Sequence, residues 1–219
     1  MQKKLLQSLK SVKKFLAEHD VLDGELEQSI EKLYLAVSKV VVEVKEENSE
    51  HLPPPSEIAN EPLSIALYSD GGCRGNPGPG AWAYVAQNHS GEVLIQGANF
   101  DMQTTNNKME LLGVINGLEN LNEKLPGLGR DPRLSSIKVI TDSKYVVEGM
   151  KSWVKSWKSR GWKKADGKAP ENLELWQRLD AQVTNFLGID WQWVKGHGGH
   201  PQNEYCDRLA NELMDQNLR

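Results

Sequence analysis

Cysteine is scarce in this sequence. Only Cys73 and Cys206 occur among 219 residues, too few and too far apart for a disulfide framework or a zinc site. Long apolar runs are also missing, because no segment approaches the roughly 20 apolar residues that cross a bilayer, and no apolar signal segment follows the basic start. We therefore expect a cytoplasmic protein with reduced cysteines and no membrane partner.

Excess positive charge is missing from the chain as a whole but present in one stretch. The formal net charge of −4 argues, taken alone, against a nucleic-acid partner. Residues 151–168, however, hold seven basic residues against one acidic residue, interleaved with Trp153, Trp157 and Trp162. Basic side chains suit phosphates and aromatic faces suit bases or sugars, so this stretch, the basic handle, is predicted to bind nucleic acid. The alternative is a solvated helix whose tryptophans face a core, which leaves the one-signed charge unexplained.

The sequence predicts three successive segments. Apolar residues recur every three or four positions from Leu5 to about Val44, with a break at "EHDVLDG" where Asp20 or Asp23 can cap a second helix, so residues 1–46 are predicted to form an α-helical hairpin. Residues 47–62 contain four prolines and few apolar residues, which is typical of a linker. Residues 63–219 form the remaining domain.

Strand and helix patterns alternate in this last domain. Strands are expected over 64–69, 81–87, 92–100, 137–141 and 189–194, and helices over 105–121, 142–157, 172–186 and 203–216. Three strands followed by alternating helices and strands predict an α/β fold with a mixed sheet covered by helices.

Acidic residues occupy notable places on this map. Asp70 and Asp142 end two strands, Glu110 lies in the first turns of a helix, and Asp207 lies within the last helix. Strand ends and the near turns of covering helices can converge, but four carboxylates brought together repel one another unless a multivalent cation lies between them. Ligands that are all oxygen favour magnesium or manganese over zinc.

At these residues the sequence resembles type 1 ribonuclease H. The resemblance rests on six stretches in the family's order, which are "YSDGGCRGNPGPGAWAY", "TTNNKMEL", "ITDSKYV", "WKSRGWK", "LWQRLD" and "WVKGHGGHPQNEYCDRLA". It implies a mixed five-stranded sheet with helices on both faces. It also implies an endonuclease that hydrolyses the RNA strand of an RNA/DNA hybrid and leaves 5′-phosphate and 3′-hydroxyl ends.

The resemblance further implies which residues act. Asp70, Glu110, Asp142 and Asp207 are the expected catalytic carboxylates, holding two Mg²⁺ ions about 4 Å apart, for which Mn²⁺ can substitute. His197 matches a mobile-loop histidine that helps with proton transfer or product release, against the alternative of an ordinary loop residue. His200 is interpreted as a helix-start residue that packs.

Substrate contacts are expected on two surfaces. The glycines after Asp70 allow a sharp turn close to the hybrid, where ribose 2′-hydroxyls distinguish RNA from DNA. By the resemblance, this surface and a DNA-strand channel with a phosphate pocket include the following residues: Cys73, Asn76, Thr105, Asn106, Asn107, Tyr145, Trp153, Trp157, Lys158, Arg160, Trp162, Lys163 and Asn172. Lys144 and Gln103 depart from the family's pattern, which leaves their effect on the DNA strand open.

Two other functions stand beside the hybrid-specific nuclease. A non-catalytic hybrid-binding module would normally have lost a carboxylate, and a DNA-acting nuclease of the same fold fits poorly with the "GNPGPG" turn and the tryptophan-rich handle. The hairpin over 1–46 lies outside the resemblance. Two helices bury little surface alone, so it is expected to mediate self-association or bind a protein partner.

Overall fold

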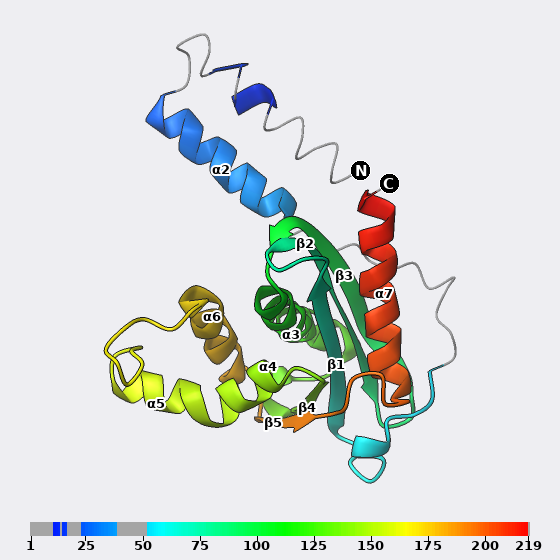
Figure 1. Cartoon of the computed structure of the whole chain (residues 1–219). Coiled ribbons are helices and arrows are strands. Elements are labelled where there is room, and N and C mark those ends of the chain that lie inside the picture. Colours follow the sequence, from blue (N-terminus) through cyan, green and yellow to red (C-terminus); the bar gives the residue numbers. More distant parts are fainter. Residues whose placement is uncertain (1–10, 14, 17–22, 39–51, 219) are drawn as a thin grey trace. The chain divides into compact units, whose positions relative to one another are not determined.

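Five strands form one mixed sheet in the order β3-β2-β1-β4-β5 (Figure 1). The computed structural model describes residues 11–13, 15–16, 23–38 and 52–218. The strands are β1 (Ser64–Cys73), β2 (Gly78–Asn88), β3 (Val93–Thr104), β4 (Ser136–Thr141) and β5 (Gly188–Trp193). The pairs β1–β2 and β2–β3 are antiparallel, whereas β1–β4 and β4–β5 are parallel. The predicted mixed five-stranded sheet is confirmed.

Two long helices, α3 (Asn106–Lys124) and α7 (Pro201–Leu218), cover the two faces of this sheet (Figure 1). The central strand β1 is buried on both sides, so its side chains alternate between the two helices. Leu67 lies against α3 at Gly117, whereas Tyr68 belongs to the apolar cluster that α7 completes with Cys206. The ends of β1 and β4 are thereby enclosed between two helices.

The remaining helices build an arm beside α3. The segment predicted as one helix over 142–157 consists of α4 (Lys144–Glu148), a π-helical turn (Gly149–Trp153) and α5 (Val154–Ser159), and α6 (Leu173–Val183) follows it. The fully buried Trp176 of α6 fills the space beside Gly149, where a Cβ atom would collide with the indole ring.

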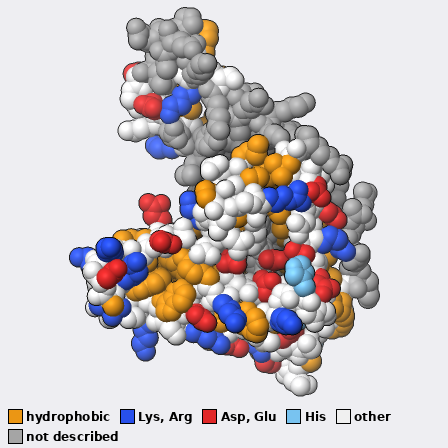
Figure 2. Space-filling model, in the orientation of Figure 1, with side chains coloured by type: hydrophobic (Ala, Val, Ile, Leu, Met, Phe, Trp, Pro, Cys, Tyr) orange, Lys and Arg blue, Asp and Glu red, His pale blue; other side chains and the backbone are white. Residues whose placement is uncertain are grey.

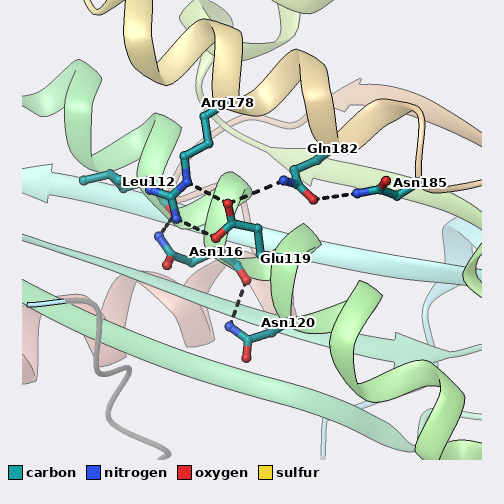
Figure 3. A network of polar contacts seen from close by, with 7 residues as sticks. All are labelled: Leu112, Asn116, Glu119, Asn120, Arg178, Gln182 and Asn185. Carbon is teal, nitrogen blue, oxygen red and sulfur yellow. Dashed lines mark hydrogen bonds and ion pairs between the residues drawn. The ribbon is translucent and has the colours of Figure 1, made fainter. Parts of the chain in front are cut away.

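A polar network fixes α6 onto α3. Figure 3 shows Arg178 and Gln182 of α6 both reaching Glu119 of α3. The Arg178 Nε atom donates to Glu119 Oε1 over 2.6 Å, and the guanidinium contacts both carboxylate oxygens. A bidentate contact between arginine and a carboxylate fixes the relative orientation of the two side chains better than a single hydrogen bond does.

Part of the predicted linker is packed rather than extended. Residues 52–62 contain a short 3-10 helix (Ser56–Ile58), and Leu52 and Ile58 are buried in the cluster formed by β1 and α7. Proline content alone predicted a linker over 47–62, and within it two buried apolar side chains hold residues 52–62 against the domain that follows. Residues 47–51 lie outside the described part.

The chain divides into two compact units, Met1–Val42 and Glu43–Arg219. In the first unit, Asp23 directly precedes α2 (Gly24–Ser38) and caps it, because its carboxylate accepts a 2.7 Å hydrogen bond from the Leu26 backbone amide. Residues 11–13 and 15–16 are helical, and Lys13 pairs with Glu27 of α2 over 3.0 Å. The rest of the predicted hairpin lies outside the described residues. Among the helices that the structure describes, none has the length and apolar character to cross a bilayer.

Candidate active site

Four carboxylates from four elements line one pocket. Asp70 lies in β1, Glu110 in α3, Asp142 directly after β4 and Asp207 in α7, and His197 lines the same pocket. Figure 2 shows acidic side chains gathered beside a histidine on this face. The convergence expected from the sequence is therefore present in the structure.

The glycines after Asp70 let α3 approach β1. Strand β1 continues through Asp70 to Cys73, so Gly71 lies in the strand and not in a turn. A Cβ atom on Gly71 would collide with the backbone of Met109, one residue before Glu110. Only Gly75, with a φ of 80°, adopts a left-handed conformation in the turn from β1 to β2. Close packing of α3 on β1 therefore explains more of the glycines after Asp70 than the expected sharp turn does.

The pocket disfavours ionised carboxylates. Burial raises the pKa of Asp70 to about 7, and the negative charges of Asp142 and Asp207 add to this rise. Burial also raises the pKa of Glu110 and of Asp142 above their usual ranges. Since like charges and a dry environment both penalise the anionic forms, the pocket is suited to a bound cation.

Neutral polar side chains orient the carboxylates. Ser143 Oγ donates to Glu110 Oε2 over 2.6 Å, and Asn106 Nδ2 donates to Glu110 Oε1 over 2.9 Å. Asn211 Nδ2 donates to Asp207 Oδ1 over 2.9 Å. The side chain of Asn203 is hydrogen-bonded to Asp142, which opposes the rise of the Asp142 pKa that burial causes.

The sequence analysis missed three of these orienting residues: Ser143, Asn203 and Asn211. A signal was available for two of them, because Asn203 and Asn211 stand four residues before and after Asp207 and share its helix face. Ser143 follows Asp142 directly and also caps α4, since its Oγ accepts a 3.2 Å hydrogen bond from the Val146 amide.

The loop between β5 and α7 closes one side of the pocket. His197 has a φ of 50°, and its Nδ1 atom lies 4.0 Å from Asp207 Oδ2, with the side chain 82% exposed. A Cβ atom on Gly196 would collide with the Asp142 carboxylate. The loop therefore passes directly over Asp142 and presents an accessible imidazole beside Asp207.

Comparison with known proteins decides the family. The family described as RNase H matches residues 62–215. Ribonuclease H of Alcanivorax borkumensis is 45% identical over 153 residues, covering 70% of this chain and 93% of that protein. The chain belongs to the ribonuclease H family.

Solved structures of ribonucleases H have the same fold. LC9-RNase H1, a type 1 enzyme with the type 2 active-site motif, is 34% identical with a TM-score of 0.57, over 70% of this chain and 73% of that one. LC11-RNase H1, isolated from compost and solved in complex with an RNA/DNA hybrid, is 25% identical with a TM-score of 0.55, over 71% of this chain and 99% of that one.

Ribonucleases H generally depend on divalent metal ions. The donor set of this pocket fits such ions, because its four acidic side chains supply only oxygen atoms, the ligands that Mg²⁺ and Mn²⁺ prefer. In the described part of the chain, no group of three or more His, Cys, Asp or Glu side chains already has the spacing of a metal site.

Five residues expected to contact the RNA/DNA hybrid adjoin the carboxylates of this ribonuclease H. Cys73 and Asn106 line the pocket, and the Asn106 backbone amide donates to Asn76 Oδ1 over 3.4 Å. Thr105 and Asn107 flank Asn106 at the start of α3. The structure thus brings these five residues to one edge of the site.

A second group lies on the arm. Tyr145 Oη accepts hydrogen bonds from Asn172 Nδ2 over 3.3 Å and from Trp176 Nε1 over 3.1 Å. These contacts bring Tyr145, which is expected in the wall of the DNA-strand channel, together with Asn172, which is expected in the phosphate pocket. Asn172 itself has a φ of 55°. Trp153 packs edge-on against both Tyr145 and Trp176.

Two residues of the basic handle differ from expectation. Trp157 is only 9% exposed and packs against Trp176, so it serves the core of the arm and offers little surface to a DNA strand. Lys158 Nζ contacts both oxygens of Asp180, over 2.9 and 2.7 Å, and its charge is thereby offset. Arg160 and Lys163 are exposed, and Trp162 is half-buried.

The two departures from the family's pattern are exposed. Lys144 follows Asp142 by two residues, and its Nζ atom lies 4.8 Å from the centre of the Trp193 ring. Trp193 Nε1 in turn donates to the Asp142 carbonyl over 2.9 Å. The Gln103 backbone amide donates to Asp101 Oδ1 over 3.0 Å.

Proposed function

We propose that this ribonuclease H hydrolyses the RNA strand of RNA/DNA hybrids and leaves 5′-phosphate and 3′-hydroxyl ends. The observation that carries the proposal is the pocket in which Asp70, Glu110, Asp142 and Asp207 meet at one edge of a glycine-rich strand. The hybrid complex of LC11-RNase H1 supports the choice of substrate. A non-catalytic module is disfavoured because all four carboxylates are present and individually oriented.

In this mechanism Asp70, Glu110, Asp142 and Asp207 hold two divalent ions, Mg²⁺ or Mn²⁺. When bound, such ions activate a water molecule and stabilise the departing 3′-oxygen. Ser143 and Asn106 hold Glu110 from both carboxylate oxygens, so this side chain keeps one orientation. Asn203 holds Asp142 and Asn211 holds Asp207, each through a side-chain hydrogen bond.

His197 is proposed to carry a proton between the site and water. It lies beside Asp207, is largely exposed, and belongs to a loop with glycines on both sides. An imidazole can accept a proton at one ring nitrogen and donate one from the other, which suits this side chain to proton transfer.

Selection of RNA is proposed for the edge formed by Cys73, Asn76, Asn106 and Asn107, whereas Thr105 is proposed to hold a DNA phosphate together with Asn172. Amides and small side chains at this edge suit ribose 2′-hydroxyls, which only the RNA strand carries. The arm with Tyr145, Asn172, Arg160, Trp162 and Lys163 is proposed to grip the DNA strand by phosphate contacts and stacking.

The test uses end-labelled RNA/DNA hybrid, RNA duplex and DNA duplex of one sequence, incubated with the full chain in Mg²⁺, in Mn²⁺ or in EDTA. Cleavage of only the RNA strand of the hybrid, requiring metal and absent in Asp70→Asn, is the expected result. Cleavage of the DNA duplex would give the site a different substrate, and binding without cleavage would make the chain a hybrid-binding module.

For the hairpin over 1–46 we propose a role in association, either with itself or with a protein partner. Val12, Phe15 and Leu33 are large apolar side chains that are each about half exposed, at 48%, 58% and 51%. Light scattering on the full chain at several concentrations tests the first option, because self-association predicts a mass above that of one chain.

A further inference from the structure

The segment directly before the matched family region, residues 52–61, packs against the catalytic domain. We call it the anchor segment. Leu52 is 8% exposed and Ile58 is fully buried, both in the cluster that contains Tyr68 and α7 residues. The family match begins only at residue 62, so the anchor segment lies outside the matched region.

One carboxylate of the anchor segment reaches the loop of the active site. Glu57 Oε1 lies 2.5 Å from His200 Nε2, and Glu57 Oε2 accepts a 2.9 Å hydrogen bond from the Tyr68 hydroxyl. The Glu57 side chain is 7% exposed. Burial alone would raise the pKa of Glu57, but the hydrogen bonds from His200 and Tyr68 outweigh it and leave this pKa below its usual value. Glu57 is therefore an ionised acceptor for the imidazole.

His200 transmits this contact to the start of α7. Its carbonyl accepts a 3.0 Å hydrogen bond from the Glu204 amide in the first turn, and the Gly199 amide donates to Glu204 Oε1 over 2.9 Å. Gln202 Nε2 adds a second link, because it donates to the Pro53 carbonyl over 2.7 Å. The anchor segment thus holds the loop and the first turn of α7 at two points.

The same loop and helix carry catalytic groups. His197 stands three residues before His200, Asn203 orients Asp142, and Asp207 lies one further turn along α7. A displacement of the α7 start would therefore shift three groups of the pocket together.

We propose that Glu57 is a positioning residue for the ribonuclease reaction, which it serves by holding His200 and so fixing the β5–α7 loop and the start of α7. This inference rests on the proposed catalytic site. Glu57 precedes the family match over residues 62–215, and it acts only through His200 and the helix that follows.

The chain offers a matched control in Glu61. This carboxylate belongs to the same segment and contacts Lys138 Nζ over 3.2 Å, and Lys138 also donates to the Glu57 carbonyl over 2.7 Å. Glu61 also accepts from Ser64 Oγ over 2.7 Å. These contacts of Glu61 lie away from the β5–α7 loop, so Glu61→Ala removes an anchor-segment carboxylate while leaving the His200 contact intact.

The experiment measures kcat and KM for hybrid cleavage in the full chain and in Glu57→Ala, Glu57→Gln and Glu61→Ala. Glu57→Ala is expected to lower kcat by roughly 10-fold with KM little changed, since small misplacements of catalytic groups act on the chemical step. Glu57→Gln, which keeps an acceptor, should recover part of the loss, and Glu61→Ala should match the unsubstituted chain. Backbone amide exchange over 195–204 should rise in Glu57→Ala alone.

His200→Ala removes the same contact from its other end and should lower kcat to a similar degree, without a further loss when combined with Glu57→Ala. This variant also tests the contact if Glu57→Ala does not fold. Equal kcat in Glu57→Ala and Glu61→Ala, or an unaffected His200→Ala, would overturn the positioning role. Asp70→Asn distinguishes failure of the positioning role from failure of the proposed function. The proposed function fails if the unsubstituted chain does not cleave the hybrid, or if Asp70→Asn still cleaves it.

Discussion

Ser143 and Glu110 join the end of β4 to the first turns of α3 through a 2.6 Å hydrogen bond. The donor is the residue after Asp142, so one contact links the surroundings of two catalytic carboxylates. Glu110 is then held from both oxygens, with Asn106 on the other side. This arrangement fixes the carboxylate before any cation binds, which is the condition for a preorganised site.

Ser143→Ala should therefore raise the Mg²⁺ concentration that cleavage requires, with a smaller effect on hybrid binding. The freed Glu110 oxygen loses its donor, and α4 loses its cap, which together cost about 1–2 kcal/mol in stability. We expect the Mg²⁺ concentration that gives half-maximal cleavage to rise severalfold, with KM for the hybrid unchanged. Ser143→Thr keeps the hydroxyl and should behave as the unsubstituted chain. An unchanged Mg²⁺ requirement in Ser143→Ala would show that Glu110 is oriented without Ser143.

Asp70→Asn should stabilise the metal-free protein at neutral pH and above. An unfolded aspartate titrates near pH 4, whereas the folded carboxyl has a pKa of about 7. Between these values the folded state binds more protons than the unfolded state, so the free energy of unfolding falls as pH rises. The substitution removes this penalty, which is at most about 4 kcal/mol for a three-unit shift.

Thermal unfolding in EDTA measures this effect. The Tm of Asp70→Asn should exceed that of the unsubstituted chain at about pH 8, and the difference should shrink toward about pH 4. Added Mg²⁺ should narrow the gap, because it offsets the repulsion only where all carboxylates remain. A gap that is constant across pH would mean that charge at Asp70 is not its cause.

The mixed sheet and the places of the four carboxylates on its strands and helices follow from the sequence because their signals are local and strong, whereas the order of the strands was not predicted. Apolar runs mark β1 and β4, and "TTNN" marks the start of α3, so the places of Asp70, Glu110 and Asp142 follow directly. The packing of residues 52–62 does not follow, since Leu52 and Ile58 are two isolated apolar residues among prolines, and their burial depends on tertiary contacts.

In the arm, too, the burial of single residues depends on tertiary contacts that the sequence does not reveal. Trp153 and Trp157 share a helical spacing that fits either a core or a binding surface, and only the position of Trp176 resolves which side chain is buried. The pairing of Lys158 with Asp180 joins residues 22 positions apart, which charge counting along the chain does not detect. Local composition predicts that the arm is basic, but not which cations are available to phosphates.

Arg160 and Lys163 should therefore matter more for hybrid binding than Lys158. Arg160→Ala and Lys163→Ala each remove an exposed charge, whereas Lys158→Ala removes a charge already offset by Asp180. Each of the first two should raise KM and reduce the slope of log KM against log salt concentration by about one unit, the value for a lost phosphate contact. Lys158→Ala should leave the slope nearly unchanged. An equal change in slope for all three would mean that the Asp180 contact opens when the hybrid binds.

Gly71→Ala and Gly72→Ala together test why glycines occur at the end of β1. A Cβ atom at Gly71 would collide with the α3 backbone at Met109, whereas the nearest atom to a Cβ at Gly72 is Asn106 Oδ1 at 3.6 Å, an ordinary contact. Gly71→Ala should push the start of α3 away from β1, at a cost of about 1–3 kcal/mol or more in the free energy of unfolding.

The same displacement moves Glu110 away from Asp70, so Gly71→Ala should also lose most hybrid cleavage under conditions where it remains folded. Gly72→Ala should lie close to the unsubstituted chain in denaturant midpoint. Chemical denaturation together with cleavage rates at a temperature well below both Tm values checks both expectations. If Gly71→Ala were as stable and as active as Gly72→Ala, close packing of α3 on β1 would not explain the glycine at this position, and contact with the hybrid would remain as its reason.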